Sequence, residues 1–455
     1  MDLTQGVIWK QLILFALPLL GSSFIQQLYN TVDLLFVGNF VGKEASAAVG
    51  ASSLMITCLV GFFGGMSVGS GVVMSQKVGG KDEEEIQKTL HTAVALSLGG
   101  GILLTVIGCI FAPFFMQWMN TPAQIMDAAV SYVRIYFLSL VSVVTYNIGS
   151  GLIRAMGNSR IPMLIQLAGG IVNVIMDMVF IVWFRSGIEG AAWATMFSQT
   201  TAAVLTLAYL MRQTGCFRLD FRKLRIHGEI LGMIAKIGVP AGMQSLVITL
   251  SNVFAQYHIN SFDVDVIAAF TAYIKVELPI YLPIVAFGQA VTTFVGQNKG
   301  AGNEERIKKG TKTCIGTGVA VTLLMSTLML AMGRWTFGLF SQDAAVIDYG
   351  MRIIQISFPF YWIYVVLEVL ASNLRGKGNS FPPMVIILSN ICVVRTVLLF
   401  VIMSFYHDVQ GIAVTYPITW SMTALCLLVY CGWRLREDRK RTKIKEKLSE
   451  MGGIG

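Results

Sequence analysis

The stretch SQKVGGKDEEEIQK, residues 75–88, returns later in the chain as GQNKGAGNEERIKK, residues 296–309. The two segments lie 221 residues apart and are identical at six of fourteen positions. A second pair, LIRAMGNSRIP at 152–162 and NLRGKGNSFPP at 373–383, has the same separation and is identical at five of eleven positions. A constant separation between independent segments indicates an internal duplication, so we expect two similar halves.

The composition is that of a membrane protein. Of the 455 residues, 55% are hydrophobic and 13% are charged, and the mean hydropathy is +0.67. Soluble domains carry about 25% charged residues. Apolar runs long enough to cross a bilayer recur from one end to the other, which predicts an all-α polytopic membrane protein. The seven cysteines have neither metal-site spacing nor the pattern of a disulfide framework.

Hydropathy predicts twelve transmembrane helices, six in each half. They are expected at residues 11–37, 47–76, 90–115, 128–153, 163–184, 190–211, 231–258, 266–296, 311–333, 349–374, 384–405 and 411–433. The chain then divides into a first lobe at 1–212, a cytoplasmic linker at 213–230, a second lobe at 231–434 and a basic tail at 435–455. Because six is an even number, both halves enter the membrane from the same side and form a parallel repeat, an architecture typical of transporters.

The lysines and arginines orient this topology. Of 34 basic residues, 27 lie near the helix ends that share a side with the N-terminus, and only Lys43, Arg185 and Arg334 lie in loops on the other side. This bias predicts that both termini are cytoplasmic. The basic tail is expected to rest against anionic membrane lipid. Since the location of the charge explains the net charge of +9, we expect no nucleic-acid partner.

Two acids stand inside apolar spans of the first half. Asp33 follows Tyr29 by one helical turn in QQLYNTVDLLFVG (26–38), and Asp177 follows Asn173 by one turn in NVIMD (173–177). An aspartate at the centre of a span costs about 2.5–3.5 kcal/mol, so each should face the protein interior or water. Two carboxylates, an amide and a hydroxyl would suit Na⁺ or would share a proton. The alternative is that donors in the fold cap both acids structurally.

These residues carry a resemblance to a known family. LYNTVDLLFVG, VGGKDEEE, GQNKGAGNEE, the paired RAMGNS and RGKGNS turns, NVIMD and GAAWAT resemble segments of the bacterial and archaeal multidrug and toxic compound extrusion (MATE) transporters. The resemblance covers essentially the whole chain. It implies cation-coupled export of organic compounds from a prokaryotic plasma membrane, with Na⁺ or H⁺ as the coupling ion, no other cofactor and a monomeric protein.

The resemblance also implies roles for particular residues. The family's first-lobe cation site falls on four positions here, namely Asp33, Asn173, Asp177 and Thr195. Tyr29 and Asn147 match positions that border that site. The second lobe departs from the family pattern, since the expected seventh helix and the middle of the tenth lack the acids that some members carry there. The first lobe would therefore carry the coupling alone.

The second lobe has its own intramembrane charges, Lys275, Glu277, Glu368 and Arg395. They are either a structural network in which two bases neutralise two acids, or groups that contact substrate. Two other functions fit the architecture. A lipid-linked precursor flippase would line its cavity with several cations, for which Lys275 and Arg395 are candidates. A membrane-embedded enzyme would need a nucleophile–base pair or a metal cluster, which the spans do not contain.

Overall fold

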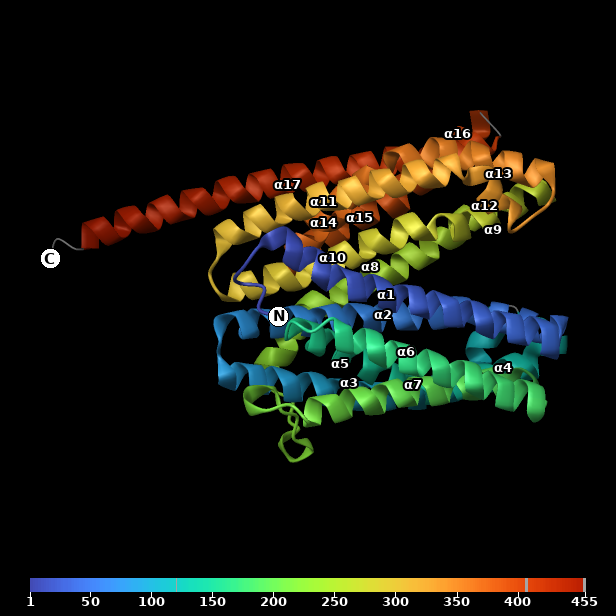
Figure 1. The fold of residues 1–455 in the computed structure, drawn as a ribbon, viewed down its shortest axis with the longest axis horizontal. Coiled ribbons are helices and arrows are strands. Elements are labelled where there is room, and N and C mark those ends of the chain that lie inside the picture. Colours follow the sequence, from blue (N-terminus) through green and yellow to red (C-terminus); the bar gives the residue numbers. More distant parts are fainter. Residues whose placement is uncertain (120, 406–407, 453–455) are drawn as a thin grey trace.

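The computed structural model describes residues 1–119, 121–405 and 408–452, without the side chains of 43–49, 51, 53–54 and 438–452. Within this part of the chain every regular element is a helix. Figure 1 shows the helices running roughly parallel to one long axis, with the N-terminus and the C-terminal helix at the same end. The predicted all-α fold is confirmed.

The first half contributes seven α-helices. They are α1 (Ile8–Phe36), α2 (Lys43–Gly80), α3 (Glu83–Trp118), α4 (Ala123–Leu138), α5 (Leu140–Ala155), α6 (Arg160–Asp177) and α7 (Gly187–Met211). Short π-helical segments extend α1 over Val37–Val41 (η1) and α6 over Met178–Trp183 (η2). The linker contains the 3₁₀ turns Gly215–Phe217 (η3) and Phe221–Lys223 (η4).

The second half contributes ten α-helices. They are α8 (Gly228–Ile259), α9 (Val264–Val276), α10 (Leu278–Gly300), α11 (Glu304–Ala331), α12 (Gly333–Gly338), α13 (Ala344–Ser357), α14 (Tyr361–Gly376), α15 (Phe381–Ile387), α16 (Arg395–Phe405) and α17 (Val409–Gly452). The 3₁₀ segment η5 (Phe358–Phe360) joins α13 to α14, and the π-helical segment η6 (Leu388–Val394) joins α15 to α16.

Twelve spans account for these helices. Ten helical stretches are long and apolar enough to cross a membrane, and the pair α4–α5, bent by 43°, makes an eleventh. The twelfth is α7, whose 25 residues are long enough but rich in alanine and threonine. Both halves thus hold six spans, as the duplication predicts.

Three predicted spans are broken rather than continuous. The eighth divides at Glu277, just before Pro279, and the tenth divides around Pro359. A proline lacks the N–H that a continuous helix needs, so both breaks lie beside a proline. The fourth divides at Ser139, whose hydroxyl donates to the carbonyl of Tyr136 at 2.6 Å and so competes with the helical hydrogen bonds.

The repeated RAMGNS and RGKGNS turns have the same backbone conformation. Gly157 and Gly378 occupy equivalent positions, and each has a φ of +87°. Only glycine adopts this region without a steric penalty. In the first turn the side chain of Asn158 then accepts bonds from the backbone N–H groups of Arg160 and Ile161, which starts α6. The sequence identity between these turns is therefore a conformational requirement.

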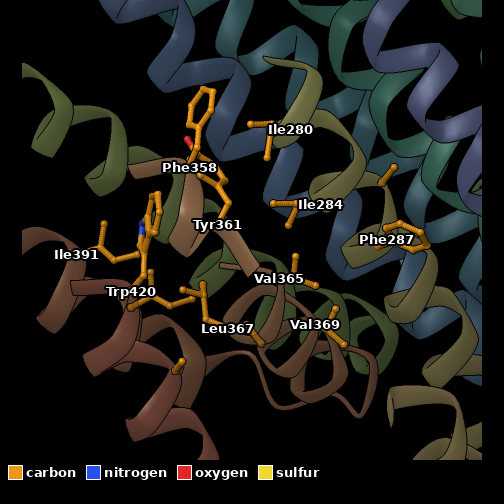
Figure 2. Packing of buried hydrophobic residues seen from close by; sticks show 14 of the residues in the cluster. Ile280, Ile284, Phe287, Phe358, Tyr361, Val365, Leu367, Val369, Ile391 and Trp420 are labelled. Atoms are coloured by element: carbon orange, nitrogen blue, oxygen red, sulfur yellow. The ribbon is translucent and has the colours of Figure 1, made fainter. Parts of the chain in front are cut away.

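Most buried apolar side chains of the second lobe form one core. It includes Ile280 and Ile284 from α10, Val365 from α14 and Trp420 from α17, which Figure 2 shows packed together. The first lobe has two smaller cores, one around Leu90 and Leu152 and one around Met116 and Val133. The linker is held against α3, since the backbone N–H of Asp220 donates to His91 Nε2 at 3.2 Å.

Glycines bring the two lobes together. We call the end with the α2–α3 and α10–α11 turns, the linker and the α17 extension the basic end. Toward it, a Cβ on Gly65 would lie 2.0 Å from the backbone nitrogen of Gly242, and a Cβ on Gly79 would lie 1.8 Å from the carbonyl oxygen of Gln297. No side chain fits at such a spacing, so α2 packs backbone to backbone on α8 and on α10.

Candidate functional site

A cavity of about 740 Å³ lies between the lobes, lined mostly by the first lobe. Thr249 from α8 and Gln289, Thr292 and Thr293 from α10 complete its wall. Five of the predicted first-lobe residues line it, namely Tyr29, Asp33, Asn147, Asn173 and Thr195. The sixth, Asp177, is fully buried behind the cavity surface. The structure therefore brings together residues from α1, α5, α6 and α7.

The carboxylates of Asp33 and Asp177 lie close enough to interact directly. Tyr132 on α4 lies within electrostatic reach of both. Among the described residues, no donor reaches Oδ1 of Asp33, Oδ1 of Asn173 or either carboxylate oxygen of Asp177. Buried polar atoms are nearly always hydrogen-bonded. These four acceptor oxygens, which have no donors among the described residues, could take up a proton or a cation.

Local structure places these oxygens. Asn173 and Asp177 occupy the last turn of α6, immediately before η2. π-Helical segments of this kind are frequent at functional sites. Alongside, a Cβ on Gly170 would meet the Tyr29 ring at 3.3 Å. The small residue lets α1 pack closely on α6, which brings Asp33 to the acid of the other helix.

The bordering residues have ordinary hydrogen bonds. The side-chain amide of Gln166 donates to the hydroxyl of Tyr29 at 3.2 Å. The side-chain amide of Asn147 donates to the carbonyl of Val143, one turn earlier in α5, at 2.8 Å. Because both residues have partners and line the cavity, they shape its wall beside the unpaired acids.

Two of the second-lobe charges are held by neutral groups. The hydroxyl of Tyr361 donates to the carboxylate of Glu277, and Tyr361 also lies against the ring of Trp420 (Figure 2). The guanidinium of Arg395 donates to the side chains of Ser251 and Asn252 at 3.1 and 2.9 Å. Neither residue lies among the described residues that line the central cavity.

Glu368 and Lys275, the other two charges of the second lobe, do not pair with each other. Glu368 forms an ion pair at 3.2 Å with Arg375, which lies two turns later in α14. Lys275 lines a different cavity, on the outer side of α1. The four charges thus do not neutralise one another as a single network. A role for any of them in contacting substrate stays a prediction.

Comparison with known proteins places this geometry in a family. A model of the MatE family matches the chain twice, at residues 18–179 and 240–401. The chain belongs to the MatE family. The two matches also coincide with the two halves of the repeat, as a parallel duplication requires.

Individual relatives agree with this assignment. The chain is 28% identical to the probable multidrug resistance protein YpnP of Bacillus subtilis strain 168, over 87% of this chain and 88% of the relative. It is 21% identical to the multidrug export protein MepA of Staphylococcus aureus strain RF122, over 83% of each chain. An outward-facing structure of a multidrug resistance MATE family transporter superimposes with a TM-score of 0.90 at 20% identity, covering 96% of this chain and 98% of that one. The protein is a membrane transporter and not an enzyme.

One residue that lines the cavity of this MATE transporter was not identified from the sequence. Arg154 counts as a basic residue at a helix end in the sequence, yet it lines the central cavity. Its guanidinium donates to the side chain of Gln289 on α10 of the other lobe at 3.4 Å. Arg375 is its equivalent in the repeat and bonds to Gln244 on α8 at 3.2 Å. The arginine that the RAMGNS and RGKGNS turns share could have marked Arg154 as a candidate.

Proposed function

We propose that this transporter exports organic compounds by alternating access and that a cation, Na⁺ or H⁺, drives the cycle from the Asp33–Asp177 site. The observation that carries the proposal is the set of four acceptor oxygens without donors on Asp33, Asn173 and Asp177. Binding of the cation would favour the conformation in which these oxygens converge, because a ligand shifts a conformational equilibrium toward the state that binds it better.

The cavity lining supports an organic, cationic substrate. Tyr29, Tyr132, Tyr136 and Tyr146 all line it, and Asp33 supplies a negative charge. Aromatic faces attract cations that have shed part of their hydration shell. Because Asp33 is shared between the cavity and the acid pair, a bound organic cation would compete with the coupling ion. Such competition is the thermodynamic basis of exchange in an antiporter.

The lining offers less support for a lipid-linked precursor flippase. Among the described residues that line the cavity, Arg154 is the only basic one. A phosphate-bearing head group is best held by several cationic donors. Lys275 and Arg395, the candidates for such a role, both lie away from this cavity.

We also propose that the basic end faces the cytoplasm of the cell that makes the protein. Support comes from the distribution of lysine and arginine, which concentrates at that end. The tail contributes to this charge, and its contact with inner-leaflet lipid stays a prediction because its side chains beyond Glu437 lie outside those described.

Reconstituted vesicles test the function. Efflux of a fluorescent organic cation is measured under a Na⁺ gradient at equal pH, and separately under a pH gradient without Na⁺. We expect one gradient to drive transport in the wild type and neither to drive it in Asp33→Asn or Asp177→Asn. Asp127→Asn, the same change at an exposed position on α4, is the control. Unchanged gradient-driven efflux in both site variants would contradict the proposal.

A further inference from the structure

A second cavity, of about 1,230 Å³, lies on the other side of α1. Its walls come from α1, α9, α10 and α11, and from Phe340 and Ser341 after α12. It shares no lining residue with the central cavity among the described residues, because α1 turns different faces to the two. Tyr29 and Asp33 face the transport cavity, whereas Phe24 and Leu28 face this one. We call it the lateral groove.

Lys275 is the charged residue of the lateral groove. It is exposed and has neither a hydrogen bond nor an ion pair within the described part of the chain. Three other basic residues inside spans have partners. Arg134 bonds to the carbonyl of Cys109, Arg352 lies over the ring of Tyr349, and Arg395 bonds to Ser251 and Asn252. Lys275, by contrast, presents to an apolar groove a cation without a hydrogen bond or ion pair in the described part of the chain.

The lining of the groove is polar toward one end. Lys275 and Thr271 lie one turn apart on α9, and Gln27 and Thr31 lie one turn apart toward the same end of α1. Toward the basic end the lining is apolar, with Leu17 and Leu20 on α1 and Leu282 and Phe287 on α10. A ligand that matches this arrangement has an anionic head and a hydrocarbon tail.

The depth of Lys275 agrees with such a ligand. It lies eleven residues after Val264, the first residue of α9, which is about 17 Å along the helix from the end opposite the basic end. The long stem of a lysine reaches toward the head-group region while its methylenes stay in apolar surroundings. A lipid that enters from that side would place its head at Lys275 and its chain toward the basic end.

We propose that the lateral groove binds one phospholipid of the leaflet opposite the basic end. Its phosphate pairs with the ammonium of Lys275, with the hydroxyl of Thr271 and the amide of Gln27 beside it. One acyl chain lies between α1 and α10, along Leu20 and Leu282. The lipid would therefore touch both lobes at the face where they separate, and it would do so without entering the transport cavity.

Native mass spectrometry of the full-length, delipidated protein tests this site. Phosphatidylglycerol is titrated against diacylglycerol with the same two chains, which differs by lacking the phosphate. We expect Lys275→Gln to weaken phosphatidylglycerol binding at least fivefold and to leave diacylglycerol binding unchanged. Lys275→Arg should retain binding. Arg352→Gln, which removes an exposed basic side chain from α13, should bind as the wild type does.

One further variant and one further ligand complete the test. Thr271→Trp, at an exposed position that fills the polar end of the groove, should reduce binding of both lipids. Inorganic phosphate alone should not bind in a Lys275-dependent manner. The proposal is overturned if Lys275→Gln binds phosphatidylglycerol as tightly as the wild type, if Arg352→Gln loses as much affinity, or if free phosphate occupies the site without a lipid.

Discussion

Gln76 and Gln297 each donate an equivalent hydrogen bond to the opposite lobe. The side-chain amide of Gln76 donates to the carbonyl of Gly376 at 2.9 Å, and that of Gln297 donates to the carbonyl of Ala155 at 2.8 Å. Each glutamine is the repeat equivalent of the other, and so is each acceptor, since both pairs differ by 221 in residue number. The two lobes are thus joined near the basic end by hydrogen bonds related by the pseudo-two-fold axis of the duplication.

The first prediction concerns this pair. Each hydrogen bond contributes about 1 kcal/mol, which corresponds to about a fivefold change in a conformational equilibrium. Gln76→Ala or Gln297→Ala should therefore increase the population in which the basic end is open. The measurement is the distance distribution between spin labels on Lys81 and Ala301. Gln87→Ala is the matched control, because Gln87 bonds to Cys216 in the linker rather than to the second lobe, and its loss should leave the distances unchanged.

The second prediction concerns the first residues of the chain. Leu3 is fully buried, its N–H donates to Gln297 Oε1 at 3.0 Å, and its carbonyl accepts from Asn298 and Arg306. The amino group of Met1 donates to the carbonyl of Gly157 in the first lobe at 3.0 Å, whereas the partners of Leu3 belong to the second lobe. Replacing Leu3 by Asp buries a charge at this junction, so it should open the basic end further than either glutamine variant.

Spin labels on Lys81 and Ala301 measure how far the basic end opens. Thr4→Asp is the control, because Thr4 lies beside Leu3 and bonds to the exposed Asp2. An equal shift in both variants would mean that the terminus acts through its net charge rather than through the buried position of Leu3.

A third prediction follows from the inter-lobe glycines. Gly79→Ala would place a Cβ 1.8 Å from the carbonyl oxygen of Gln297, and Gly300→Ala would place one 1.8 Å from the carbonyl oxygen of Gln76. The lobes would have to separate, so transport should fall by about tenfold or more while the helical content stays the same. Vesicle efflux and circular dichroism measure the two quantities.

Gly100→Ala serves as the control for this pair. Gly100 lies in α3, and a Cβ there would meet nothing within 4 Å. Alanine is the better helix former by about 1 kcal/mol, so this variant should transport normally and unfold at a slightly higher temperature. Loss of transport in all three variants would indicate that α-helical glycines are needed for flexibility and not for close packing.

The fourth prediction treats Asp33 and Asp177 as one site. Their carboxylates interact directly, so removal of either charge should abolish coupling. The double variant Asp33→Asn/Asp177→Asn should then be little worse than either single variant, because residues that act as a unit are not additive. Gradient-driven efflux is measured for the wild type, the two single variants and the double variant, which together form a double-mutant cycle. Additive losses would show that the two acids act independently.

The fifth prediction separates the lobes. Glu277 and Glu368 are held by Tyr361 and Arg375 and have no contact with the acid pair. Glu277→Gln and Glu368→Gln should therefore change the apparent affinity for exported compounds or the protein's stability, and leave the dependence on the ion gradient in place. Efflux of several compounds is measured against gradient size. Loss of gradient dependence in Glu277→Gln would place coupling in the second lobe.

Much of this protein can be predicted from local patterns. Apolar runs set the spans, because length and hydropathy are properties of one helix at a time. The duplication follows from identities at a constant separation, and the glycines of the two GNS turns keep a conformation that other residues disfavour. The cost of an acid in a span identifies Asp33 and Asp177 as interior residues before any neighbour is known.

The tertiary structure alone decided which of these residues meet. Asp33 and Asp177 are 144 residues apart, and their encounter depends on the close packing of α1 on α6 beside Gly170. The packing of the whole bundle places Arg154 at the central cavity and Lys275 at the lateral groove, although both are basic residues of similar appearance in the sequence. Helical periodicity fixes which residues share a face, whereas the rotation of each helix against its neighbours depends on contacts made by the whole bundle.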